Sequence, residues 1–168
     1  MIIKCVWEHN GNDTLLYAEN FIGAFARGET KEVALRKIPQ EVASYLRWCG
    51  KSVPEQLVPE IVAEKESALH IADADTEVIF DTEKEPLSAE EFFVLKDLTL
   101  KSAADFLSLY QSIPDKYKSN LTARKTFYGI TPVTAEEMYA HTKNVNDYYW
   151  REIGVSADND GTILDCRQ

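Results

Sequence analysis

Histidine and cysteine are scarce in this sequence of 168 residues, with three of each. The cysteines, Cys5, Cys49 and Cys166, form neither a CxxC pair nor a zinc-finger spacing. Their odd number and wide separation are typical of reduced thiols in a reducing compartment, so we expect a cytoplasmic protein. No P-loop, GxSxG, HExxH or Cys/His pairing is present, and the sequence therefore indicates no nucleophile and no general base.

Long apolar runs are also missing. No run approaches the roughly 18 residues that a membrane-spanning helix needs. The apolar stretch at the N-terminus is interrupted by Lys4 and Glu8 and is too short for the core of a signal peptide. We therefore expect no membrane partner. The apolar content of 45% is enough to bury a core in one domain or in two small ones.

Positive charge is in deficit. The formal net charge is −10, and because residues 1–50 carry equal numbers of basic and acidic side chains, the excess lies beyond residue 50. Such a balance repels a phosphate backbone and argues against a nucleic-acid partner. The acidic run between residues 73 and 85 could bind calcium, but it lacks the glycine and the closing glutamate of an EF-hand loop, which favours a solvated linker.

The first 66 residues have the pattern of a small sheet with one helix. Apolar and β-branched runs at 2–7 and 15–20 are separated by turn residues and predict a hairpin. A third short run lies within 21–28. A further extended element is expected within 52–66. With the helix that precedes it, the predicted order is β-β-β-α-β.

That helix is expected to begin after Thr30, a plausible N-cap, and to end at Gly50. Pro39 lies inside it, so we expect a kink or a break there. The apolar residues of the predicted buried face are Val33, Leu35, Ile38, Val42 and Leu46.

The chain changes character at residues 67–87, an acidic connector that contains one strand-like run at 76–80. Ser88 and Glu91 then form the pattern of a capping box at the start of a long helix that ends at Pro114.

Thr134 and Glu137 form a second capping box, and the helix over 134–153 ends at Gly154. The same signature recurs at Thr162 and Asp165, where a third helix would begin. Only a few residues follow, which is too short for a stable helix. Either these residues cap a neighbouring element, or the chain is the front part of a helical domain that continues beyond Gln168.

Residues 20–35, NFIGAFARGETKEVAL, resemble the HicB-like antitoxin domains. The residues at matching places are Gly23, Gly28, Glu29, Thr30, Glu32 and Ala34. The resemblance covers about the first 50 residues. It implies a β-β-β-α-β unit on a partial ribonuclease-H-like sheet, and, because the antitoxins of this family neutralise a small ribonuclease, a toxin partner.

Residues 88–168 resemble half of the four-helix bundle of the DinB/YfiT-like superfamily of metalloenzymes. TAEEMYAHTKNVNDYYW matches the second-helix motif of that superfamily, with His141 in the ligand position. The resemblance implies a divalent metal held by three histidines. No HxxxH pair occurs, however, and the other two histidines, His9 and His70, lie outside this region.

His141 follows a helical spacing with apolar residues, which predicts that it faces inward. The residues of this stripe are Met138, His141, Val145, Tyr148 and Glu152. An inward imidazole could bind zinc, nickel or iron. Since no partners stand at ligand spacing, a histidine hydrogen-bonded to a tyrosine or carboxylate in a partial core is the alternative.

An aromatic cluster on the same helix also has two interpretations. Its members are Tyr139, Tyr148, Tyr149 and Trp150. They could line a ligand pocket, but such clusters are more often core or interface.

The sequence as a whole predicts an α+β protein: a HicB-like unit at 1–66, the connector at 67–87 and a partial DinB-like helical region at 88–168. Two amphipathic helices leave an apolar stripe uncovered, so we expect a homodimer whose helix pairs approximate a four-helix bundle.

Three functions follow. The first is a non-catalytic or vestigial association module. The second is a DinB-like metal-dependent enzyme whose site is completed by another chain or by residues beyond Gln168. The third is an antitoxin-like protein that binds a small toxin.

Overall fold

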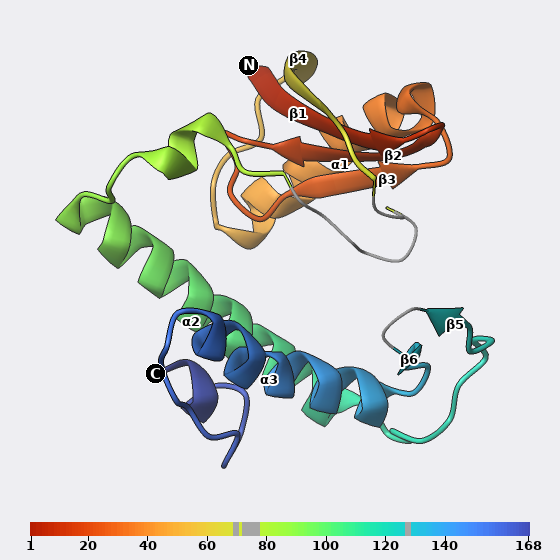
Figure 1. The fold of residues 1–168 in the computed structure, drawn as a ribbon, viewed down its shortest axis with the longest axis vertical. Helices are drawn as coiled ribbons and strands as arrows, with labels where there is room; N and C mark the ends of the chain where they lie inside the picture. The colour runs from red at the N-terminus through yellow and green to blue at the C-terminus, as the bar shows by residue number, and fades with distance from the viewer. Residues whose placement is uncertain (69–70, 72–77, 127–128) are drawn as a thin grey trace. The chain divides into compact units, whose positions relative to one another are not determined.

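The computed structural model describes residues 1–68, 71, 78–126 and 129–168, which form two compact units. The first unit runs from Met1 to Pro86 and the second from Leu87 to Gln168, so the first extends beyond residue 66. The predicted α+β class is confirmed, because a four-stranded sheet is combined with three α-helices (Figure 1).

The sheet of the first unit has the strand order β3-β2-β1-β4. The elements of this unit are β1 Ile2–Asn10, β2 Asp13–Ala18, β3 Phe25–Gly28, α1 Lys31–Trp48, β4 Val58–Glu66 and the short 3-10 helix η2 Asp81–Lys84. The first three strands form an antiparallel meander, whereas β4 returns parallel to β1 after the crossover through α1. The predicted order β-β-β-α-β is therefore confirmed. The two edge strands are β3 and β4.

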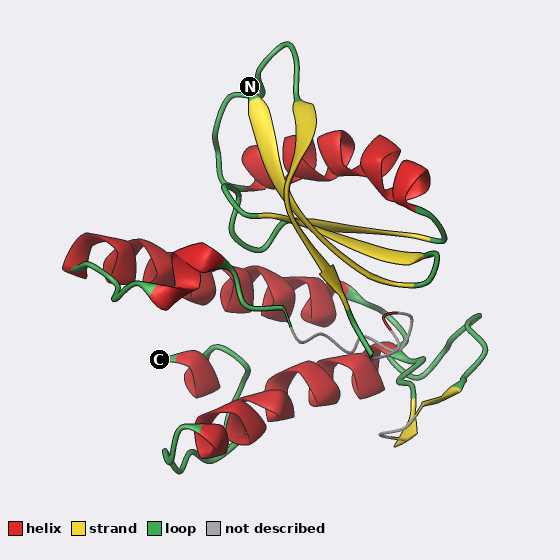
Figure 2. Ribbon diagram, turned by 45° about the horizontal axis from the view of Figure 1, so that its top comes forward, coloured by secondary structure: helices red, strands yellow, loops and turns green. Residues whose placement is uncertain are grey.

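Both faces of this sheet carry packed side chains. On one face lies α1 (Figure 2), where Leu16 and Ile38 are fully buried in the core. On the opposite face Glu8 is fully buried and accepts a hydrogen bond from Tyr17 Oη at 3.0 Å. The ring of Phe80 meets Tyr17 edge-on there, with 5.2 Å between ring centroids. This second face is only partly covered among the described residues, because Phe25 on it is 53% exposed.

The helix α1 runs through Pro39 without interruption, so a break there is the wrong prediction. Proline removes one helical hydrogen bond, a loss of about 3 kcal/mol. The burial of Ile38 and Val42 on either side of it contributes about 1.5–3 kcal/mol each and outweighs that loss. Thr30 is the predicted N-cap, and its Oγ1 accepts the Val33 N–H at 3.4 Å.

The strand-like run predicted at 76–80 is not borne out where it can be seen. Residues 76 and 77 lie outside the described residues, and residues 78–80 are not in a strand. They lead directly into η2.

The second unit is mainly helical. Its elements are α2 Ala89–Ser112, β5 Lys125–Thr126, β6 Gly129–Ile130, α3 Ala135–Glu152 and the 3-10 turn η3 Asp165–Arg167. Both predicted capping boxes are present at the starts of α2 and α3, where Ser88 and Thr134 each accept a backbone N–H at 3.2 Å. No helix in the described part of the chain has the length and apolar character needed to cross a membrane.

As expected for so short a segment, no α-helix begins at Thr162, and the 3-10 turn η3 follows it. This C-terminal segment packs against α3 instead. Ile163 is 2% exposed, and its N–H donates to Tyr139 Oη at 3.0 Å. Asn146 Nδ2 donates to the Cys166 carbonyl at 2.9 Å. These long-range contacts hold the turn where its own helical propensity would not.

Acid is expected to weaken the starts of α2 and α3. The Ser88 hydroxyl and N–H lower the pKa of Glu91, and the Val133 and Thr134 N–H groups lower the pKa of Glu137. Because each folded pKa lies below its unfolded value of roughly 4.3, the contribution is complete above that pH and is lost as the pH falls through the folded pKa. Urea unfolding followed by circular dichroism between about pH 6 and pH 3 checks this.

The matched variant for this measurement replaces both glutamates by glutamine, which keeps an acceptor but does not titrate. The stability of the double variant should depend less steeply on pH below roughly 5. An unchanged slope would show that other carboxylates control the acid response.

Candidate functional site

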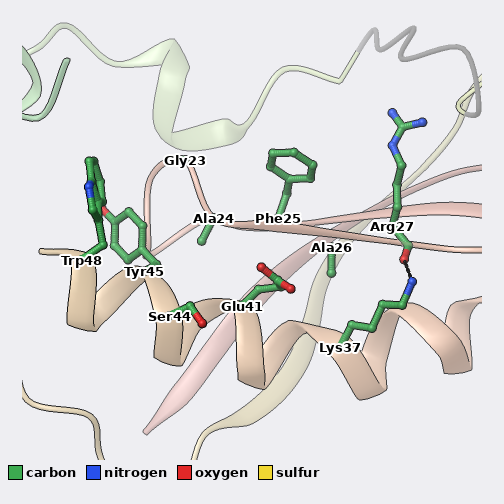
Figure 3. A pocket seen from close by; sticks show the side chains of 10 residues that line it. All are labelled: Gly23, Ala24, Phe25, Ala26, Arg27, Lys37, Glu41, Ser44, Tyr45 and Trp48. Atoms are coloured by element: carbon green, nitrogen blue, oxygen red, sulfur yellow. Dashed lines mark hydrogen bonds between the residues drawn. The ribbon is translucent and has the colours of Figure 1, made fainter. Parts of the chain in front are cut away.

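A groove of about 600 Å³ lies between β3 and the second half of α1 (Figure 3). Its lining comes from both elements and the turn before β3: Gly23, Ala24, Phe25, Ala26 and Arg27 on one side, and Lys37, Glu41, Ser44, Tyr45 and Trp48 on the other. Because β3 pairs with no strand beyond β2 among the described residues, the groove borders an edge of the described sheet.

Small side chains on the strand create this space. Ala24 and Ala26 lie on the side of β3 that faces α1 and are 8% and 4% exposed. Tyr45 and Trp48 form one end of the groove, with 5.9 Å between their ring centroids. Burial, together with the hydrogen bond to Cys49, raises the pKa of Tyr45 to about 12, so its hydroxyl stays protonated at neutral pH. The groove therefore has an apolar floor and an uncharged aromatic end, while Lys37, Glu41 and Ser44 line its α1 side.

The backbone N–H and C=O groups of Phe25 and Arg27 in β3 point out of the sheet, away from β2. The Ala24 carbonyl accepts the Ala18 N–H of β2 at 2.9 Å, and the alternation of an antiparallel ladder then directs Phe25 and Arg27 away from β2. The Arg27 carbonyl agrees with this direction, because it accepts a hydrogen bond from Lys37 Nζ at 2.8 Å. The Phe25 side chain is 53% exposed and points away from α1.

His141 is exposed on α3 and does not lie on the inward face. The predicted direction is wrong because the packed side of α3 carries Tyr139 and Asn146, which contact the C-terminal segment. Among the residues that the structure describes, no three His, Cys, Asp or Glu side chains are grouped to hold a metal ion. The assignment of His141 as a metal ligand stays a prediction.

The other two histidines do not join it. His70 lies outside the described residues. His9 belongs to the first unit, where its ring stacks on Trp7 at 4.2 Å and its Nε2 lies 3.2 Å from Glu64 Oε1. These contacts give His9 a structural environment on β1.

The predicted aromatic cluster of α3 divides into two parts. Tyr139 packs inside the helical unit, 4.0 Å from the ring of Tyr110 and 5.9 Å from that of Phe106. A hydrogen bond from Tyr110 to Glu136 raises the pKa of Tyr110 to about 12. The remaining members of the cluster, Tyr148, Tyr149 and Trp150, are 62%, 62% and 41% exposed. Tyr139 thus packs within the unit and is partly buried, while the others are exposed.

The thiol of Cys5 is unreactive. Cys5 is fully buried in the first unit, and burial raises its pKa to about 11. A protonated, inaccessible thiol is not a nucleophile.

Comparison with known proteins identifies no relative: no family model, no curated protein and no solved structure matches this chain.

Proposed function

We propose that this chain is a non-catalytic association module that forms a homodimer through its second unit. The observation that carries the proposal is how little this unit buries. Among its described residues, Ala103 and Ile163 are the buried apolar side chains. The large apolar side chains that stay exposed on α2 and at the end of α3 are Phe92, Phe93, Val94, Leu109, Tyr148, Tyr149, Trp150 and Ile153. Such a surface is typical of an interface.

The exposed aromatic side chains supply a large part of the area that a dimer interface needs. Five of them lie on α2 and at the end of α3 and are 41–62% exposed: Phe92, Phe93, Tyr148, Tyr149 and Trp150. At roughly 150–250 Å² each, they present roughly 400–700 Å² of surface. A standard interface buries about 800 Å² on each partner.

A second copy is the occupant that the chain itself favours. The helix α2 carries apolar residues around most of its circumference, and such a helix needs neighbours on more than one side. In the described part of the first unit, α1 already packs on one sheet face and the ring of Phe80 on Tyr17 of the other. Two copies of the α2–α3 pair supply four helices, the number of a common bundle.

A lysine in place of Leu109 is expected to weaken the dimer at least about tenfold, because a charge then enters an apolar interface. Leu109 is 60% exposed and shares a helix face with Leu95 and Leu98, so the variant should keep its fold. Sedimentation equilibrium measures the dissociation constant. The matched control is Ser108→Lys, which adds the same charge to the neighbouring polar position.

The expected result is a wild-type dimer at micromolar concentration that Ser108→Lys preserves and Leu109→Lys dissociates. A wild-type monomer at that concentration contradicts the proposal, as does equal weakening by both variants. Circular dichroism of each variant shows whether its helix content is unchanged.

Antitoxin-like binding of a small protein is the second candidate. The HicB-like resemblance of the first 50 residues implies it, and the β-β-β-α-β order supports it. The open edge of β3 gives this unit a surface for a partner. Direct binding of a small basic ribonuclease to the purified chain tests it, and inhibition of that ribonuclease is the expected result.

The DinB-like enzyme stays a third proposal that depends on His141. Metal analysis of the purified dimer tests it. A stoichiometric divalent metal that is lost in His141→Ala would favour the enzyme, whereas a metal-free dimer would favour the association module.

A further inference from the structure

We propose that the open edge of β3, with the groove beside it, binds an extended segment of a partner protein as an added strand. This inference concerns the first unit alone and goes beyond the proposed dimer, which uses the second. It rests on the backbone direction of β3, on the shape of the groove and on the exposed Phe25.

The outward backbone groups of β3 favour an extended segment over a helix. Phe25 and Arg27 direct their N–H and C=O groups out of the sheet, two residues apart, which is the repeat of a neighbouring strand. A strand satisfies such groups by continuing the ladder. A helix cannot, because its own backbone groups are already paired within it.

The two sides of the edge define the chemistry of the segment. Its residues would point alternately to the two faces of the sheet. Those on the α1 side enter a hollow whose floor is Ala24 and Ala26 and whose end is Trp48. Those on the other side pack on the half-exposed ring of Phe25. The segment should therefore carry apolar side chains on the Phe25 face, and on the α1 face side chains that pack on the alanine floor beside the charged Lys37 and Glu41.

Lys37 offers a second explanation of this edge, namely protection of β3 against pairing with another strand. Its ammonium covers the Arg27 carbonyl, and lysines at sheet edges commonly prevent unwanted strand pairing. Protection alone does not account for a hollow of about 600 Å³ beside the strand, nor for an exposed phenylalanine on its other face. Lys37 is a flexible side chain that can leave the carbonyl when a strand arrives.

The test selects binders from a phage library of random twelve-residue peptides against the full chain. The best peptide is then synthesised, and its affinity is measured by fluorescence anisotropy. Phe25→Pro removes the outward N–H while leaving the hydrogen bonds between β3 and β2 intact. Its matched control is Phe25→Thr, which loses the same ring but keeps the N–H.

Phe25→Pro should bind the peptide about three- to tenfold more weakly than Phe25→Thr, the effect of one hydrogen bond. Lys37→Met should bind it more tightly than the wild type, because the Arg27 carbonyl becomes available. Amide-proton NMR of each variant verifies that the sheet is intact.

Three results overturn the proposal: no enriched peptide, equal affinity of the proline and threonine variants, or unchanged affinity of Lys37→Met. A wild-type dimer that Phe25→Pro dissociates in the absence of peptide also overturns it, since the edge would then bind a second copy. None of these results depends on Leu109, so the failure of this inference is distinguishable from the failure of the helical dimer.

Discussion

Replacement of Ile38 by alanine is expected to lower the free energy of unfolding of the first unit by about 3 kcal/mol. Ile38 is fully buried at the middle of α1 and packs in a core that includes Ile3, Leu16 and Val42. The substitution removes three carbon atoms and leaves a cavity that the strands beneath α1 cannot fill without moving. The loss therefore combines a transfer contribution and a cavity contribution.

Urea unfolding measures this loss, with Ile22→Ala as the matched control. Ile22 is 57% exposed in the turn before β3, so the same chemical change there should cost at most about 0.5 kcal/mol. Equal losses in the two variants would mean that the packing of α1 does not determine the stability of this unit.

Local signals predicted the first unit well. The turn residues between the first two apolar runs produce the β1–β2 hairpin, and Thr30 caps α1 as expected. The break expected at Pro39 is not present, because the free-energy cost of a proline in a helix was considered without the burial of Ile38 and Val42. A helix pinned on both sides of a proline by core residues does not stop there.

In the second unit, local sequence signals predicted the helix caps but not the direction of His141. Ser88 and Thr134 cap their helices as predicted, because a capping box is complete within four residues. The direction of His141 depended on a distant partner, the C-terminal segment, which packs on the Asn146 side of α3. The sequence alone gives no such signal, because the burial of Asn146 depends on the packed C-terminal segment, to which it donates a hydrogen bond.

The groove was not predicted because it needs β3 and α1 to come together. In hindsight Ala24 and Ala26 alternate with Phe25 and Arg27, which indicates a strand with small side chains on one face. Whether such a face is packed or hollow depends on the helix opposite. We expect the junction to set the distance between the two elements, because a Cβ at Gly28 would lie within 3.1 Å of atoms at the start of α1.

Alanine at Gly28 is therefore expected to destabilise the first unit by about 2 kcal/mol. A Cβ at this position would lie 2.6 Å from the Ala34 nitrogen and 2.7 Å from the Thr30 carbonyl oxygen. Both are backbone atoms at the start of α1, so no side chain can rotate to make room. The φ angle of Gly28 is outside the left-handed region, so the penalty is steric, and it exceeds the gain from a less flexible unfolded chain.

Gly11→Ala separates the two causes by which alanine can harm a glycine site. Gly11 has a φ of 62° and no atom within 4 Å of the added Cβ, so its cost of about 1 kcal/mol is conformational. Only Gly28→Ala should also move α1 relative to β3, which amide-proton NMR detects at Ala26 and Ser44 on opposite sides of the groove. A loss below about 0.5 kcal/mol at Gly28, with these signals unchanged, would show that the junction yields easily. The contact at Gly28 would then not be what fixes the width of the groove.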